Sequence, residues 1–189
     1  MTPLNAPLSD NIDILAVRGK LTIKELSLPA DTLTGDPGIL SARYFPKSPR
    51  KFRWGVVPHY SHRNSKEIKA AVKATKAKLI DATDPVEKVL SEISSCDAII
   101  SSSLHGLIVA DSYGVPCAWL NKKSHGDHTF KFADYCSGVG RPDFEVVTVE
   151  NLGDRLAEDP DLQPFSPSAE LQDRLIQALQ AAPLRSEPA

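Results

Sequence analysis

The sequence predicts an α/β fold built on a doubly wound parallel sheet. Short, continuously apolar runs of the buried-strand type alternate with stretches of helical period, and three such strand–helix units follow one another between residues 54 and 113. A length of 189 residues with 41% hydrophobic residues suffices for one well-packed core plus appendages. Successive strand–helix units favour a parallel sheet with right-handed crossovers, because each helix returns the chain across the sheet before the next strand begins.

The individual elements follow from apolar period and from start and stop signals. Ser65, Asp84-Pro85 and Ser168 stand where helices should begin, and Gly114 followed by Pro116 stands where one should end. The expected strands are residues 11–17, 54–58, 78–81, 98–100, 115–120 and 144–149. The expected helices are residues 22–28, 38–41, 65–76, 85–95 with Val86, Val89, Leu90 and Ile93 inward, 104–113, 130–136, 151–157, and a last helix after Ser168 with Leu171, Leu175, Ile176 and Leu179 on one face.

Composition excludes several classes of protein. A net charge of −2 and a pI near 6.2 provide no excess of positive charge to displace the counterions of a nucleic acid. Residues 1–10 have neither the basic cluster nor the apolar core of a signal peptide, and no apolar run reaches membrane-spanning length. The cysteines Cys96, Cys117 and Cys136 are odd in number and scattered, so we expect reduced, packed thiols in a cytoplasmic protein.

Residues 43–53 carry five basic residues and two prolines, which favours a loop. The first interpretation is a solvated linker with its aromatic side chains packed beneath it. The alternative is a surface that meets an anionic sugar, a lipid diphosphate or a membrane.

Polar residues gather where two of the predicted strands end. Ser101, Ser102, Ser103 and His105 follow one strand and open the next helix, where backbone amides and the helix dipole favour an anion. His59, His62 and Arg63 follow another strand of the same sheet, and we expect them at the same rim. The alternative is that the serines are helix caps and His105 is a packing histidine.

Metal and dinucleotide sites are not expected. His59 and His62 are spaced three apart, as are His125 and His128, but the second pair lies in a glycine-containing polar loop with no carboxylate-rich neighbourhood. The ten glycines nowhere form a Gly-x-Gly-x-x-Gly pattern. We therefore predict no bound metal and no cofactor.

Three segments, in order, resemble those of the polysaccharide pyruvyl transferase family. They are Val-Arg-Gly-Lys-Leu-Thr at residues 17–22, Gly-Asp-Pro-Gly-Ile-Leu at residues 35–40, and Ser-Ser-Leu-His-Gly-Leu-Ile-Val-Ala-Asp-Ser-Tyr-Gly-Val-Pro at residues 102–116. The resemblance implies the C-terminal, Rossmann-like domain of a two-domain GT-B-like fold. It assigns residues 1–35 to the end of a first domain and its connection, residues 36–160 to the α/β domain, and residues 161–189 to a linker and an amphipathic helix.

The resemblance also implies a reaction. Family members make a cyclic pyruvate ketal on a sugar from phosphoenolpyruvate, without a cofactor, and the acceptor is a sugar or a lipid-linked oligosaccharide at the inner face of the membrane. His105 and Arg18 take the catalytic roles, and the substrate contacts fall to Ser101, Ser102, Ser103, His59, His62, Arg63 and Lys131. Because family members are markedly longer, the resemblance leaves open a truncated or degenerate copy, a fragment, or a subunit whose cleft a second copy or a partner subunit completes.

Two other classes of function remain open. A GT-B-type glycosyltransferase would bind a nucleotide sugar at the same helix and would need an acidic residue for the ribose or sugar, for which Asp111 and Asp134 are the candidates. A non-catalytic binding or assembly module would keep the fold and the last helix without needing His105.

Overall fold

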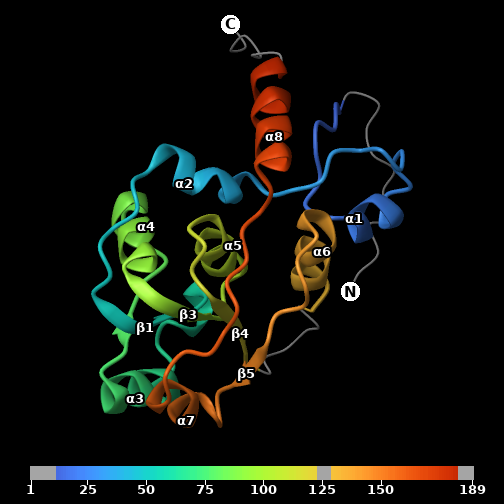
Figure 1. Cartoon of the computed structure of the whole chain (residues 1–189). Coiled ribbons are helices and arrows are strands. Elements are labelled where there is room, and N and C mark those ends of the chain that lie inside the picture. Colours follow the sequence, from blue (N-terminus) through green and yellow to red (C-terminus); the bar gives the residue numbers. More distant parts are fainter. Residues whose placement is uncertain (1–11, 123–128, 183–189) are drawn as a thin grey trace, which may run out of the picture. The chain divides into compact units, whose positions relative to one another are not determined.

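The structure is a computed structural model, and it describes residues 12–122 and 129–182 (Figure 1). The described residues form two compact units. The sheet unit comprises residues 38–122 and 142–166, and the terminal unit comprises residues 12–37, 129–141 and 167–182. The domain boundaries expected from the sequence stay a prediction.

The sheet unit contains a five-stranded parallel sheet, which confirms the predicted fold class. The strands are β1 (Phe52–Val57), β2 (Lys78–Leu79), β3 (Cys96–Ser101), β4 (Cys117–Asn121) and β5 (Val146–Thr148). Their order across the sheet is β2-β1-β3-β4-β5, with Val56 opposite Ile100 in the central pair. From β1 the chain crosses to β2 on one side, and from β2 it crosses back to β3 on the other side of β1. The topological switch point of the sheet therefore lies between β1 and β3.

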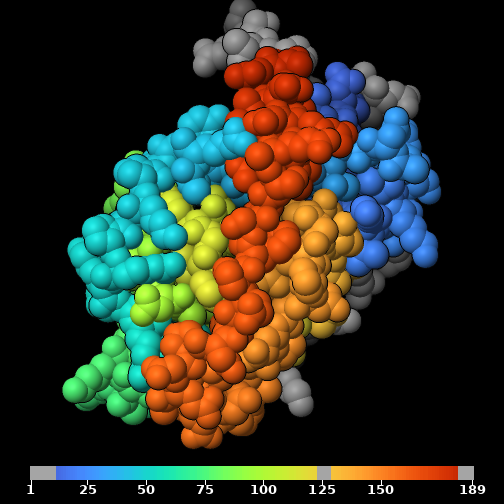
Figure 2. Space-filling view, viewed as in Figure 1, coloured from blue at the N-terminus to red at the C-terminus, as the bar shows by residue number. Residues whose placement is uncertain are grey.

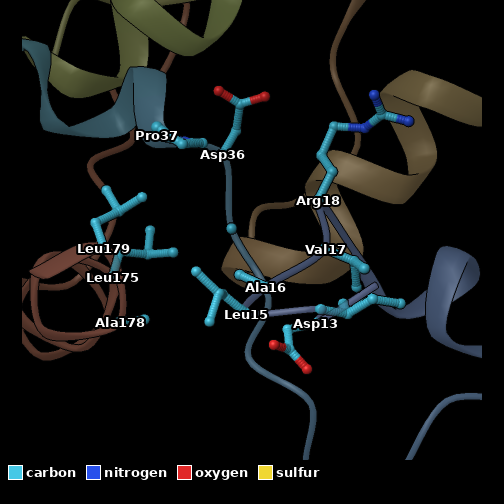
Figure 3. A pocket seen from close by; sticks show the side chains of 12 residues that line it. Asp13, Leu15, Ala16, Val17, Arg18, Asp36, Pro37, Leu175, Ala178 and Leu179 are labelled. Carbon is cyan, nitrogen blue, oxygen red and sulfur yellow. The ribbon is translucent and has the colours of Figure 1, made fainter. Parts of the chain in front are cut away.

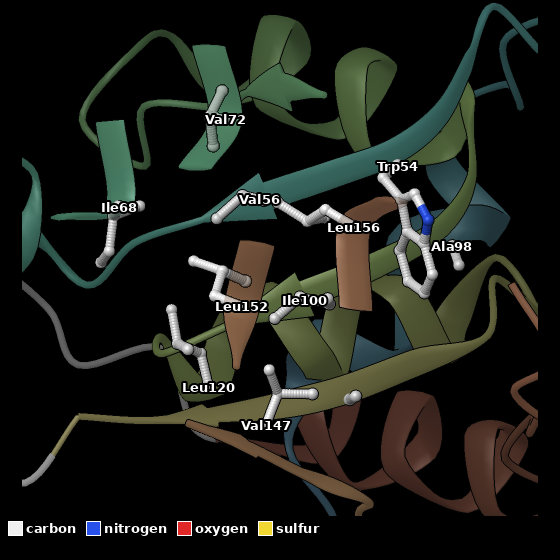
Figure 4. Packing of buried hydrophobic residues seen from close by; sticks show 11 residues of the cluster. Trp54, Val56, Ile68, Val72, Ala98, Ile100, Leu120, Val147, Leu152 and Leu156 are labelled. Carbon is white, nitrogen blue, oxygen red and sulfur yellow. The ribbon is translucent and has the colours of Figure 1, made fainter. Parts of the chain in front are cut away.

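One face of the sheet is covered by α3 (Lys66–Thr75) and α7 (Leu152–Ala157). Their apolar side chains pack against alternate residues of the strands, as Figure 4 shows for Ile68, Leu152 and Leu156 around Trp54 and Val56. This packing buries α3 along a single stripe and leaves its lysines in solvent.

The intervening strand residues point to the opposite face, where α4 (Val86–Ser94) and α5 (Leu104–Ser112) contact the sheet. Gly55 of β1 leaves room there for the Ile99 and Cys96 side chains of β3, both fully buried. The same unit also contains η1 (Pro37–Leu40, of which Pro37 is counted with the terminal unit), α2 (Ser41–Tyr44) and η2 (Tyr60–His62). A connector of residues 158–166 follows α7 along the surface of the sheet unit (Figure 2), where Ser166 lies beside Gly114.

The terminal unit consists of α1 (Lys20–Glu25), α6 (Thr129–Val139) and α8 (Ala169–Ala181) with their flanking segments. Two glycines without side chains let the backbone of α6 lie directly against the backbone of the segment before α1. A Cβ atom at Gly19 would overlap the Asp134 carbonyl group, and one at Gly138 would overlap the Arg18 carbonyl oxygen. Any larger residue at either position would force these segments apart.

Several expected elements differ in detail. Residues 12–17 do not form the expected strand: residues 12–16 have no regular structure, and Val17 alone pairs, in a single bridge with Thr34. The apolar residues there have no sheet to bury them, and Ile12 remains 53% exposed. Val86, expected to face inward, is 61% exposed at the first position of α4, where the first turn extends beyond the core.

The expected helix ends and the expected packed thiols are confirmed. Gly114 adopts φ +62° directly after α5, as the predicted helix end requires, and Ser65 and Ser168 cap α3 and α8 through their side chains. All three cysteines are buried free thiols. Within residues 12–122 and 129–182, none of the helices has the length and apolarity needed to cross a bilayer.

Candidate functional site

The carboxyl ends of β1 and β3 carry a cluster of polar side chains at the switch point of the sheet. His59 follows β1, and its backbone N–H donates to Ser102 Oγ at 2.9 Å. His62, in η2, places Nδ1 3.2 Å from the same hydroxyl oxygen. The structure thus brings two neighbouring histidines together with a serine that lies 43 and 40 positions later in the sequence, where open α/β sheets bind their ligands.

The three serines have different surroundings. Ser101 Oγ is buried and lies 2.8 Å from the carbonyl oxygens of both Val57 and Ser103, while it accepts from Ser103 N at 3.0 Å. Ser101 therefore holds the turn between β3 and α5 together. Ser103 is the N-cap residue of α5, but its side chain makes no capping hydrogen bond, so the alternative in which all three serines serve as caps does not describe the turn.

His105 is exposed on the first turn of α5. The glycine that follows it is required by packing, because a Cβ atom at Gly106 would overlap Ser101 Oγ and lie 3.1 Å from Val57 Cγ1. This close approach fixes the beginning of α5 on the ends of β1 and β3. The His-Gly pair thus combines an exposed imidazole with a tightly seated helix, which argues against a packing role for the histidine.

Arg63 is exposed and ends η2. The hydrogen bonds from the Thr83 backbone and side chain lower the pKa of Asp81, and the positive charge of Arg63 adds to this effect. Arg63 therefore lies on the side of the rim toward the residues that follow β2. The Ser102 hydroxyl binds the two histidines of this rim.

The terminal unit carries a second polar cluster, around Arg18. Its guanidinium Nη2 lies 3.2 Å from Oδ2 of Asp134, whose side chain is 0% exposed. Thr22 binds both oxygens of that carboxylate, from its backbone N–H to Oδ1 at 2.9 Å and from Oγ1 to Oδ2 at 2.7 Å. Burial, and then the Arg18 charge, lower the pKa of Lys131, so the two cations lie within electrostatic reach of each other.

A cavity of about 500 Å³ lies in the same unit. Figure 3 shows Leu15, Leu175 and Leu179 on its apolar side, with the Arg18 guanidinium turned away from them toward a helix. This cavity was not predicted from the sequence, because residues 11–17 were expected to form a strand.

Asp134 was named in the sequence analysis only as a candidate for binding a ribose. Both acidic candidates for that role, Asp111 and Asp134, are fully buried, and Asp111 Oδ1 lies 3.4 Å from Cys117 Sγ. Neither carboxylate is presented at the surface to a sugar. The signal for the observed role of Asp134 is its place three residues after Lys131 on one helix, which puts both side chains on neighbouring positions of the same face.

Across the described part of the chain, no three side chains of His, Cys, Asp or Glu are grouped as a metal site. His125 and His128 lie outside the described residues. The absence of a metal and of a cofactor stays a prediction.

Comparisons with known proteins agree with the resemblance seen in the motifs. A family sequence model described as polysaccharide pyruvyl transferase matches residues 7–124. An uncharacterized protein of Acanthamoeba polyphaga mimivirus is 35% identical over 137 residues, covering 66% of this chain and 47% of that protein. The succinoglycan biosynthesis protein ExoV of Rhizobium meliloti is 27% identical over 130 residues, covering 68% of this chain and 41% of its own length. The chain thus spans less than half the length of these two relatives, and no solved structure matches it.

Proposed function

The chain belongs to the polysaccharide pyruvyl transferase family, and we propose that it binds phosphoenolpyruvate and takes part in transferring the pyruvyl group to an exopolysaccharide sugar as a cyclic ketal. The observation that carries this proposal is the exposed His105 on the first turn of α5, three residues after Ser102, whose hydroxyl binds His59 and His62 at the switch point. The similarity to a succinoglycan biosynthesis protein supports an exopolysaccharide acceptor.

The atom balance of this reaction states what the site must do. The enol carbon of phosphoenolpyruvate gains a proton and becomes a methyl group, while two hydroxyl oxygens of one sugar bond to the central carbon. The bond from that carbon to the phosphate oxygen breaks. One hydroxyl proton ends on the methyl carbon and the other leaves with phosphate, so the reaction is redox-neutral and needs an anion site with groups that donate and accept protons.

The side chains of the two clusters are suited to these tasks. Histidine is the side chain that most often serves as a general acid or base, so His105, together with His62 or His59, can carry protons to the enol carbon and from the hydroxyl groups. The amino end of α5 attracts the phosphate through its backbone amides and dipole. Arg18 and Lys131 supply positive charge for the carboxylate or phosphate, and the described residues give Arg18 Nε no hydrogen-bond partner although it is buried. Ser101 supports the turn rather than the ligand.

The acceptor and its setting are part of the proposal. We assign the acceptor to the class of sugars or lipid-linked oligosaccharides, handled in the cytoplasm at the inner face of the membrane. A second copy or a partner subunit would contribute the remaining acceptor contacts.

Calorimetric titration of the purified chain with phosphoenolpyruvate, and in parallel with nucleotide sugars, tests the proposal. We expect saturable phosphoenolpyruvate binding that weakens in the His105→Ala and Arg18→Ala variants and persists in Arg174→Ala, a matched control that removes an exposed arginine of α8. Binding of a nucleotide sugar instead would favour the glycosyltransferase class. Folded protein that ignores phosphoenolpyruvate, or binds it equally well in all variants, would contradict the proposal.

A further inference from the structure

Asp134 is a buried carboxylate whose acceptor positions are occupied by residues of the Arg-Gly-x-x-Thr segment. Its side chain is 0% exposed, and both oxygens accept hydrogen bonds from Thr22, while Oδ2 also pairs with Arg18 Nη2. A buried carboxylate is retained in a fold only where its charge is paired and its lone pairs are satisfied. Here one arginine and one threonine from the same short segment meet both needs.

The spacing of that segment follows from this contact. Gly19 has an extended backbone and is the residue directly before α1. Arg18 therefore precedes the helix, and Thr22 lies in its first turn. The missing side chain at Gly19 lets α6 come close enough for Asp134 to reach both residues. The motif is thus a binding site for one carboxylate of α6, and its first member is the arginine proposed to bind the donor.

The same contact limits how Arg18 can move. An arginine side chain loses considerable rotational freedom when it binds an anion, and a guanidinium already held by a fixed carboxylate has lost part of it beforehand. With Nη2 engaged by Asp134, Arg18 keeps 30% of its side chain exposed. The Lys131 ammonium lies within electrostatic reach on the same helix as Asp134, so one carboxylate is set against two cations and the cluster retains a positive charge.

We propose that Asp134 is a positioning residue that fixes the Arg18 guanidinium for the anionic donor. This inference rests on the proposed function, because it takes Arg18 to be the group that binds phosphoenolpyruvate. The competing electrostatic role makes the opposite prediction: a carboxylate that only neutralises Arg18 would repel the donor, so its removal would strengthen binding.

The test measures phosphoenolpyruvate affinity by calorimetry for the parent chain and for Asp134→Asn, Thr22→Val and Thr22→Ser. Asparagine keeps the shape of Asp134 but removes the charge that holds Arg18, so we expect affinity about tenfold weaker, which corresponds to about 1.4 kcal/mol. Thr22→Val removes the hydroxyl that orients the carboxylate and should weaken binding, whereas Thr22→Ser should restore it. Asp31→Asn, at an exposed position of the same unit, is the matched control and should bind like the parent.

A second readout separates this role from a contribution to folding. In ¹⁵N spectra of labelled arginine, a held guanidinium gives separate, slowly exchanging Nη signals, and Arg18→Lys identifies those of Arg18. We expect these signals in the parent chain and their loss in Asp134→Asn, recorded at a temperature below the thermal midpoint of that variant, where it is folded. Should that variant not fold, Thr22→Val carries the same comparison.

The outcomes distinguish the two proposals. Unchanged Arg18 signals in folded Asp134→Asn, or phosphoenolpyruvate binding that is equal or tighter, would overturn the positioning role. A parent chain that does not bind phosphoenolpyruvate, yet loses its Arg18 signals in Asp134→Asn, would overturn the proposed function while the positioning of Arg18 stands.

Discussion

Gly106 offers a test of the way in which α5 is seated on the sheet. An added methyl group at this position would overlap Ser101 Oγ and approach Val57 Cγ1 at 3.1 Å and Ser101 Cβ at 3.2 Å. The Ser101 hydroxyl cannot move away without giving up its contacts with Val57 O and Ser103 N. Overpacking of this kind costs about 1–3 kcal/mol, which outweighs the roughly 0.5–1 kcal/mol that alanine gains over glycine in a helix.

Gly153 is the matched control, because it is also a helical glycine but a Cβ atom there would meet no atom within 4 Å. We expect Gly106→Ala to lower the thermal midpoint, by about 2–4 °C for each kcal/mol lost in a chain of this size, and Gly153→Ala to raise it slightly. Differential scanning calorimetry of both variants provides the measurement. A Gly106→Ala protein as stable as Gly153→Ala would refute the close contact between α5 and the ends of β1 and β3, and with it the geometry of the candidate site.

Three further predictions concern stability and reactivity. Leu156→Ala, at a fully buried position, should lower the free energy of unfolding in urea by about 2–5 kcal/mol, whereas Val86→Ala, at a 61% exposed one, should change it by less than about 0.5 kcal/mol; similar losses would contradict the assigned burial. Burial and the Arg18 charge lower the pKa of Lys131 below 10.5 in the folded protein. The unfolded chain therefore binds the ammonium proton of Lys131 more tightly, and the free energy of unfolding rises as the pH increases from the folded-state pKa to 10.5. Lys131→Met should therefore be more stable than the parent at pH 7, with a difference that shrinks near pH 10.5, and urea unfolding that shows a constant difference would count against this. Burial raises the pKa of the Cys96 thiol to about 12, so this cysteine should react with a maleimide only after denaturation, and rapid labelling of the native protein at pH 8 would show that the beginning of β3 is open to solvent.

The sequence was sufficient to predict the sheet because its central strands are buried on both faces. Ala98, Ile99 and Ile100 form an uninterrupted apolar run, which is the pattern of a central parallel strand, and all three are fully buried. Residues 12–16 show where the same reasoning fails. Ile12, Ile14, Leu15 and Val17 make this an apolar, strand-like run, but a strand also needs a neighbour to accept its hydrogen bonds, and pattern alone does not reveal whether one is present.

The candidate site was predictable in its members but not in their pairing. Ser102 and His62 could each be placed at the end of a strand, and the strand order then decided that these ends are adjacent. The contact of Arg18 and Thr22 with Asp134 joins positions 112 to 116 residues apart, with only the glycines as a local sign of close approach. Long-range pairs of this kind depend on tertiary packing, which short sequence motifs do not encode.

A two-dimensional ¹H–¹⁵N titration with phosphoenolpyruvate would test the central claim most directly, because it locates the donor on the chain. We predict saturable shifts in the amide signals of residues 101–106 and in the signals of Arg18 and Lys131. Residues at the amino ends of the strands, on the opposite side of the sheet from the site, should show little change. Saturable shifts confined to other parts of the chain, or no shifts from a folded protein, would contradict it.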